Sequence, residues 1–244
     1  ADILLRNTSW TFARDAQQDV AFAGTYYYDG QGFLVPADLG VSSARELDGA
    51  RVCVMPATTT ALNLDDYETT YGLSFTRTLV DTPADGVAAY AQGECDAFTN
   101  DVSSLAGLRG SLEDPDAHLI LPDIISKEPL GPVVRSGDAR FTEAARWVLF
   151  ALIAAEEYGV TAQNASEQAV SARNPEVLRL LGASQNLGAS LGLSPDFALN
   201  AIEARGHYGE IFDRHLGADS PLGLTRGLND QWTRGGLLYA PPFR

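Results

Sequence analysis

Residues 51–60 read RVCVMPATTT, an apolar strand that runs into a polar turn and the start of a helix. From there to residue 121, strand patterns alternate with helix patterns. Helices are expected at 58–71, 83–92 and 102–109, and strands at 51–55, 74–80, 95–99 and 118–121. This alternation is typical of a doubly wound, mostly parallel α/β sheet. Ligands of such sheets bind beyond the carboxyl ends of the strands, which here lead into residues 56–60 and 100–101.

The flanking segments continue the pattern with short apolar strands and amphipathic helices. Strands are expected at 1–5, 20–23, 32–35 and 131–135, and helices after Thr11, at 42–47 and at 141–158. The chain is mainly helical after that point. Its tail, 219–244, is rich in glycine, proline and aromatic residues and is expected to be ordered with little regular structure.

The composition excludes several classes of partner. The chain has 244 residues and a formal net charge of −15 at pH 7, and Lys127 is its only lysine. This acidic balance argues against binding to nucleic-acid phosphates and against adhesion to anionic membranes. No apolar run approaches the ~20 residues of a spanning helix, so no membrane insertion is expected. The longest run, 147–155, ends at Glu156-Glu157, a pair expected to lie on a solvated helix face.

No motif indicates catalysis, a metal or a cofactor. The histidines, His118, His207 and His215, lack metal-ligand spacing, and the two cysteines form no CxxC motif. The sequence also lacks a Gly-x-Ser-x-Gly elbow and the glycine fingerprints of nucleotide-binding proteins. We therefore expect a binding protein without metal or cofactor.

Three features favour binding of a small charged ligand, and each has a plainer structural explanation. Residues 58–60, three threonines, could hold an anion at a helix N-terminus or simply cap that helix. Asp101 could hold an ammonium group or cap the helix that follows it. Arg14 could bind a carboxylate bidentately or lie exposed on the surface. An anion clamp and a carboxylate together would suit the zwitterion of an amino acid.

Long, specific stretches across the chain carry a family resemblance. They are RNTSWTFARD (6–15), YYDGQGF (27–33), VCV (52–54) with TTT (58–60), GECDAFTND (93–101), ISKEPLGP (125–132), NPE (174–176), YGEIF (208–212) and GGLLYAPP (235–242). With these stretches the sequence closely resembles the periplasmic general L-amino-acid-binding proteins of ABC importers, which are type II solute-binding proteins. The resemblance covers essentially every residue.

The resemblance implies a fold of two α/β lobes joined by two crossovers. Residues 28–128 match a complete doubly wound lobe 2. Residues 1–27 and 129–244 match lobe 1 with a helical C-terminal extension. The family's lobe 1 opens with a further β-α-β-α stretch, and this chain begins at what resembles the third strand, so lobe 1 is expected to be truncated.

The resemblance also assigns ligand-binding roles. The matching positions are Arg14, Asn7, Ser9, Thr11, Thr58, Thr59 and Asp101. Arg14 matches the arginine that pairs with the ligand α-carboxylate, beside a polar turn formed by Asn7, Ser9 and Thr11. Thr58 and Thr59 match the loop that completes the carboxylate site, and Asp101 matches the aspartate that holds the α-ammonium. Trp10 and Tyr28 match either pocket aromatics or packing residues.

The function implied is that of a non-enzymatic, periplasmic solute-binding component of an amino-acid ABC transporter. Its partners would be an L-amino acid and the transporter permease. One alternative is a homo-oligomeric scaffold with weak or no ligand binding. Another is an enzyme related to cyclohexadienyl dehydratases, which share this fold, but such an enzyme needs a general acid that the sequence does not offer.

Two further expectations follow from the resemblance. Cys53 and Cys95 fall on neighbouring strands of lobe 2, at a spacing compatible with a disulfide, although two buried thiols are the alternative. Loss of the opening β-α-β-α stretch would leave residues 1–5 as an apolar edge strand. Because such an edge is a template for pairing with another chain, a homo-oligomer is expected. The alternative is that the C-terminal region, 160–244, folds over the gap and keeps the chain monomeric.

Overall fold

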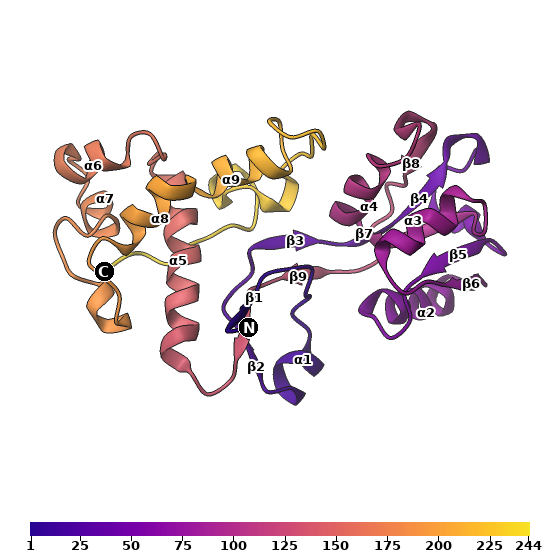
Figure 1. The fold of residues 1–244 in the computed structure, drawn as a ribbon, viewed down its shortest axis with the longest axis horizontal. Helices are drawn as coiled ribbons and strands as arrows, with labels where there is room; N and C mark the ends of the chain where they lie inside the picture. The colour runs from indigo at the N-terminus through magenta and orange to yellow at the C-terminus, as the bar shows by residue number, and fades with distance from the viewer. The chain divides into compact units, whose positions relative to one another are not determined.

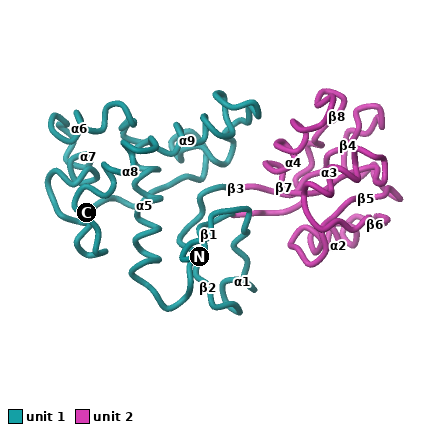
Figure 2. The backbone as a smooth tube through the Cα atoms, in the orientation of Figure 1, with its two compact units in different colours: residues 1–27, 130–244 teal, residues 28–129 magenta.

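The chain divides into two compact units (Figures 1 and 2). The computed structural model describes residues 1–244. Unit 1 comprises residues 1–27 and 130–244, and unit 2 comprises residues 28–129. The chain crosses between the units in β3 (Tyr27–Asp29) and in β9 (Glu128–Leu130), which pair in a two-stranded sheet.

Unit 2 contains a five-stranded sheet in the order β6-β5-β7-β4-β8. Its strands are β4 (Gln31–Pro36), β5 (Arg51–Val54), β6 (Thr76–Leu79), β7 (Ala97–Asp101) and β8 (His118–Ile120). β5 runs parallel to β6 and β7, whereas β4 runs antiparallel to β7 and β8. The expectation of a mostly parallel sheet is therefore wrong, because only half of the pairings are parallel. The strands of the alternating region do share one direction, but β4, from the preceding segment, inserts between β7 and β8 and runs opposite to both.

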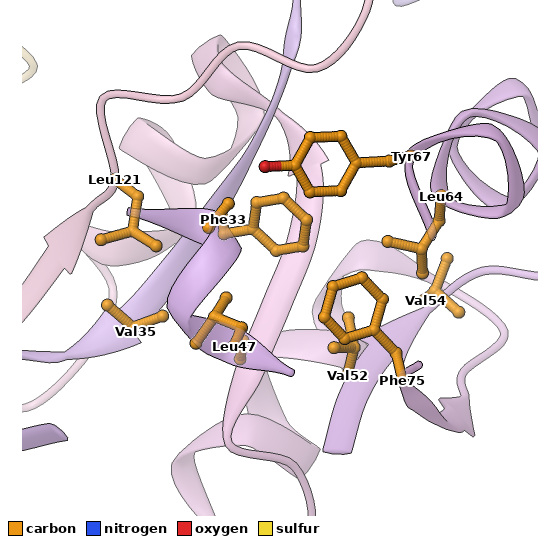
Figure 3. Close-up of a cluster of buried hydrophobic side chains, with 11 residues drawn as sticks. Phe33, Val35, Leu47, Val52, Val54, Leu64, Tyr67, Phe75 and Leu121 are labelled. Carbon is orange, nitrogen blue, oxygen red and sulfur yellow. The ribbon is translucent and has the colours of Figure 1, made fainter. Parts of the chain in front are cut away.

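Apolar layers cover both faces of this sheet. The helices of unit 2 are α2 (Thr59–Tyr71), α3 (Pro83–Ala91) and α4 (Val102–Arg109). On one face, Phe33 and Val54 belong to a cluster that includes Leu64 of α2 (Figure 3). On the other face, Leu34 and Phe98 pack with side chains of α3 and α4. The adjacent residues Phe33 and Leu34 serve opposite faces, as the two-residue period of a strand requires.

Cys53 and Cys95 form a disulfide within unit 2, with their Cα atoms 5.6 Å apart, which confirms the predicted pairing. Cys53 lies in β5. Cys95 lies just before β7, the parallel neighbour of β5, and not in the strand as the sequence suggested. Both cysteines are buried in the apolar layer that also contains residues of α3 and α4. The disulfide therefore closes a loop that contains α2, β6 and α3.

Unit 1 combines a small sheet with a group of helices. The sheet has the order β1-β10-β2 and is antiparallel throughout. Its strands are β1 (Ile3–Leu4), β2 (Val20–Phe22) and β10 (Val133–Arg135), and α1 (Phe12–Gln17) lies between β1 and β2 in sequence. The other helices are α5 (Ala139–Glu157), α6 (Ala165–Ser171), α7 (Pro175–Leu180), α8 (Phe197–Arg205) and α9 (Tyr208–His215).

α5 is the central helix of this group, and its apolar side packs against α7, α8 and α9. Figure 1 shows the shorter helices arranged around it. Although α5 has 19 residues, neither it nor any other helix has the length and apolar character needed to cross a membrane.

Glu156, near the end of α5, corrects one expectation. The sequence placed it on a solvated face, yet its side chain is only 7% exposed. It accepts hydrogen bonds from Arg226 Nη1 and Nη2 at 3.1 and 3.0 Å and from Arg234 Nη2 at 2.5 Å. Burial alone would raise the pKa of Glu156, but the two arginines outweigh it and lower the pKa below its ordinary value. These ion pairs attach the C-terminal tail to α5, and no local pattern in the sequence signals them.

The disulfide gives a stability prediction. Removing it in the variant Cys53→Ala/Cys95→Ala should lower the free energy of unfolding of unit 2 by about 3–4 kcal/mol, because the bond restricts the unfolded chain over a loop of this length. Urea denaturation of the oxidised wild type and the variant measures the difference. Thiol titration of the denatured, unreduced wild type is the control. Two titratable thiols per chain would contradict the disulfide itself.

Candidate functional site

Arg14 is held in unit 1 by the turn that precedes it. Thr11 is the N-cap of α1, and its hydroxyl accepts a hydrogen bond from the Arg14 backbone N–H at 3.3 Å. The Arg14 guanidinium donates from Nη1 to the Ser9 carbonyl oxygen at 2.8 Å. Arg14 forms no ion pair with a carboxylate of the protein within 4.0 Å. Because a guanidinium carries five N–H donors, this single bond fixes the group and leaves further donors for a ligand.

The polar turn at residues 6–9 is fixed from several sides within unit 1. Ser9 is buried and bridges Leu130 in an antiparallel pairing. The Tyr26 hydroxyl donates to the Arg6 carbonyl oxygen at 2.5 Å. Asn7, at the exposed centre of the turn, also makes polar contacts. The structure thus brings Asn7, Ser9, Thr11 and Arg14 together in one segment.

The two aromatic candidates lie on different elements. Trp10 stacks on Phe22 of β2 with ring centroids 5.2 Å apart, which supports a packing role for it within unit 1. Tyr28 lies at the centre of the crossover strand β3 and is half-buried. Its role in ligand binding stays a prediction.

In unit 2, Thr58 serves as the N-cap of α2. Its hydroxyl accepts from the Ala61 backbone N–H at 3.2 Å and donates to the Met55 carbonyl oxygen at 2.8 Å. This hydroxyl therefore caps the helix, and it already donates its only proton to the Met55 carbonyl oxygen. An anion at this helix start would instead be bound by the backbone N–H groups of the first turn and by the Thr59 hydroxyl, since the first N–H groups of a helix lack intrahelical partners.

The residue just before this cap has an unusual backbone. Ala57 has φ of 57° and is the only residue other than glycine with positive φ. A left-handed conformation is unfavourable for an alanine because of its Cβ. Such strain is typical of segments whose geometry is fixed by function or by the surrounding fold. It directs the chain from β5 into α2.

Asp101 ends β7 and is buried, with 7% of its surface exposed. It occupies the N-cap position of α4, but its side chain makes no capping hydrogen bond there. The plain explanation, a helix cap, therefore does not hold for this carboxylate. In the antiparallel pairing of β4 with β7, Asp101 lies directly opposite Gln31, so the two side chains share a face of the sheet.

Gln31 is a residue that the sequence reasoning missed. It is fully buried, and its Nε2 donates to the Thr60 carbonyl oxygen at 3.1 Å and to the Thr99 hydroxyl at 2.9 Å. The Thr99 hydroxyl in turn donates to the Gly32 carbonyl oxygen at 2.8 Å. Gln31 Oε1 has no hydrogen-bond partner in the protein. The available signal was a glutamine at the start of a strand whose other inward positions are apolar.

Comparisons with known proteins show the family to which the chain belongs. No protein-family model matches the chain. An ancestral arginine-binding protein bound to arginine is 21% identical, with a TM-score of 0.53 over 65% of this chain and 67% of that one, and shows the fold alone. A periplasmic binding protein from Brucella ovis with glutathione bound is 47% identical, with a TM-score of 0.97 over 100% of this chain and 77% of that one. The fold is therefore that of the type II periplasmic binding proteins.

Two curated relatives define the class further. The glutamate/glutamine/aspartate/asparagine-binding protein BztA of Rhodobacter capsulatus is 51% identical over all of this chain and 72% of its own length. The general L-amino acid-binding periplasmic protein AapJ of Rhizobium johnstonii is 48% identical over the same shares. The chain belongs to the periplasmic amino-acid-binding proteins of ABC transporters.

The strained residue gives a prediction. Ala57→Gly should leave the free energy of unfolding within about 0.5 kcal/mol of the wild type or above it, because relief of the left-handed strain offsets the flexibility that glycine adds to the unfolded chain. The matched control is Ala88→Gly at an exposed position within α3, which should cost about 1 kcal/mol. Urea denaturation followed by circular dichroism compares the two. Equal losses in both variants would show that Ala57 is not strained.

Proposed function

We propose that the protein binds L-amino acids by their zwitterionic head group and delivers them to an ABC-transporter permease, without catalysing a reaction. The observation that carries the proposal is the pair of charged groups described above. Arg14 is fixed by a backbone carbonyl and has no carboxylate partner in the protein, and Asp101 is buried and does not cap its helix. In this proposal unit 1 corresponds to lobe 1 of the family and unit 2 to lobe 2.

Each end of the zwitterion has suitable partners. Arg14 binds the α-carboxylate bidentately, which a planar guanidinium does better than any other side chain. Thr59 and the backbone N–H groups at the start of α2 complete the carboxylate site, with Thr58 shaping the turn as N-cap. Asn7, Ser9 and Thr11 support Arg14 and supply further polar contacts. Asp101 binds the α-ammonium, for which a buried carboxylate is the natural partner.

The relatives indicate which amino acids to test. BztA is named for glutamate, glutamine, aspartate and asparagine, and AapJ for L-amino acids in general. The Brucella ovis protein was solved with glutathione. The γ-glutamyl end of glutathione carries the same free α-ammonium and α-carboxylate as glutamate. A site that recognises this head group accepts both, so glutathione is a second candidate ligand.

The head-group proposal predicts that Arg14→Ala and Asp101→Ala each weaken binding of the preferred amino acid by about 2–5 kcal/mol, because each variant leaves one buried charge of the ligand unpaired. Calorimetric titration with the four acidic and amide amino acids and glutathione measures this. Arg173→Ala and Asp66→Ala, both exposed, are the matched controls and should bind like the wild type. Unchanged affinity in either test variant would remove that residue from the site.

A homo-oligomer is a second proposal, carried by exposed apolar side chains around β1. β1 pairs with β10 in the unit 1 sheet. Leu4, Leu5 and Phe12 in the same segment are 43%, 63% and 80% exposed. We propose that two copies associate through these apolar side chains. Without amino-acid binding, such association would favour the scaffold alternative.

The association proposal predicts a mass above that of one chain. Light scattering after size exclusion should give a multiple of 26.1 kDa at micromolar protein, and Leu4→Lys should lower it, because a charge replaces an exposed apolar side chain of the contact. A mass near 26.1 kDa for the wild type across a dilution series would contradict the oligomer.

A further inference from the structure

The polar turn of unit 1 begins with a tight γ-turn. The Thr8 backbone N–H donates to the Arg6 carbonyl oxygen at 2.6 Å, a bond that spans three residues. Asn7 is the exposed central residue, and its φ is not positive, so the turn is of the inverse type. The chain then passes directly to Ser9, whose carbonyl oxygen accepts the Arg14 guanidinium. The conformation of this turn therefore sets the position of the backbone that holds Arg14.

Both ends of the turn are attached to segments that lead into the crossover strands. At one end, Ser9 bridges Leu130 in an antiparallel pairing. At the other end, the Tyr26 hydroxyl donates to the Arg6 carbonyl oxygen at 2.5 Å. Burial raises the pKa of Tyr26 above its ordinary value, so this hydroxyl keeps its proton and remains a donor. The Arg6 oxygen accepts two hydrogen bonds, one for each lone pair.

The backbone of Tyr26 is itself fixed from two sides. Its N–H donates to the Leu130 carbonyl oxygen at 2.9 Å. Its carbonyl oxygen accepts the Tyr208 hydroxyl at 2.8 Å, and Tyr208 is the first residue of α9. The next residue, Tyr27, stacks on Phe212 of the same helix with ring centroids 6.4 Å apart. Helix α9 thus holds the chain where it enters β3.

Helix α9 is packed closely on α5 and the C-terminal tail. Arg226, which pairs with Glu156 of α5, lies 5.1 Å from the ring centroids of both Tyr208 and Phe212. A Cβ at Gly209 would lie 3.0 Å from Arg226 Nη1 and from Glu156 Cδ. Such packing leaves little room for α9 to shift. A continuous set of contacts therefore runs from α5 through α9 to Tyr26 and the polar turn.

We propose that Tyr26 is a positioning residue for the carboxylate end of the ligand: its hydroxyl holds the turn at residues 6–9 in the geometry in which Ser9 fixes Arg14, and Tyr208 holds Tyr26 within reach of that turn. Without the hydroxyl, the turn is attached at one end and adopts further conformations in which Arg14 is misplaced. The apparent affinity falls in proportion to the population of those conformations. The inference rests on the proposed role of Arg14.

The test compares two variants that each remove one hydroxyl and keep the ring. Tyr26→Phe should weaken binding of L-glutamate about fivefold, the factor that one neutral hydrogen bond contributes to an equilibrium. The matched control is Tyr158→Phe, which removes a hydroxyl that donates to Glu176 Oε2 at 3.0 Å elsewhere in unit 1. It should lose similar stability in urea denaturation and keep the affinity of the wild type in calorimetric titration. Equal losses of affinity in both variants overturn the inference.

A double-mutant cycle separates positioning from a general loss of stability. Tyr208→Phe alone should also weaken L-glutamate binding. Because Tyr208 acts through the Tyr26 hydroxyl, the variant Tyr26→Phe/Tyr208→Phe should bind no more weakly than Tyr26→Phe. Losses that add independently contradict this order of action and overturn the inference.

Arg14→Ala distinguishes failure of the inference from failure of the proposed function. If Arg14→Ala weakens L-glutamate binding and Tyr26→Phe binds like the wild type, only the inference falls. If Arg14→Ala has no effect, the proposed role of Arg14 falls and the inference with it.

Discussion

The side-chain amide of Gln31 links the elements of unit 2 that carry the candidate residues. Its Nε2 joins the first turn of α2, through the Thr60 carbonyl oxygen, to β7, through the Thr99 hydroxyl. Separating these elements would leave the buried Gln31 Nε2 donor without its acceptors, at a cost of about 1–3 kcal/mol, so the network opposes their separation. The threonine turn and Asp101, two residues beyond Thr99, thereby keep a fixed spacing.

The strand that carries Gln31, β4, runs opposite to its two neighbours. Hydrophobic periodicity and helix caps predicted where strands and helices of unit 2 lie, because both are local signals. The direction of β4 was not predictable in this way, since it depends on which strands flank it in space. β4 inserts between β7 and β8, and this puts Gln31 directly opposite Asp101. A polar residue that looks misplaced in an apolar strand thus faces a buried aspartate.

In unit 1, the sequence does not predict which charged side chains are paired and withdrawn from solvent. The pair Glu156-Glu157 looks like an exposed helix end, and Glu157 is indeed exposed. Glu156 is buried because Arg226 and Arg234, far away in sequence, return to it. Burying this carboxylate without both arginines would be costly, so helix and tail depend on each other. The composition supplies many acidic residues and few basic ones, and only the fold determines which acidic residues are paired.

The sequence names candidate residues, but it does not decide between capping and binding roles for them. Thr58 and Asp101 each occupy the N-cap position of a helix, where capping and ligand binding compete for the same side-chain atoms. The sequence left both explanations open at each position, and the structure resolves them differently. Thr58 commits its hydroxyl to the helix, so its loop can offer only backbone donors and Thr59 to an anion. Asp101 makes no capping bond at the start of α4, where the Ser103 backbone N–H points to Asp29 Oδ1 instead.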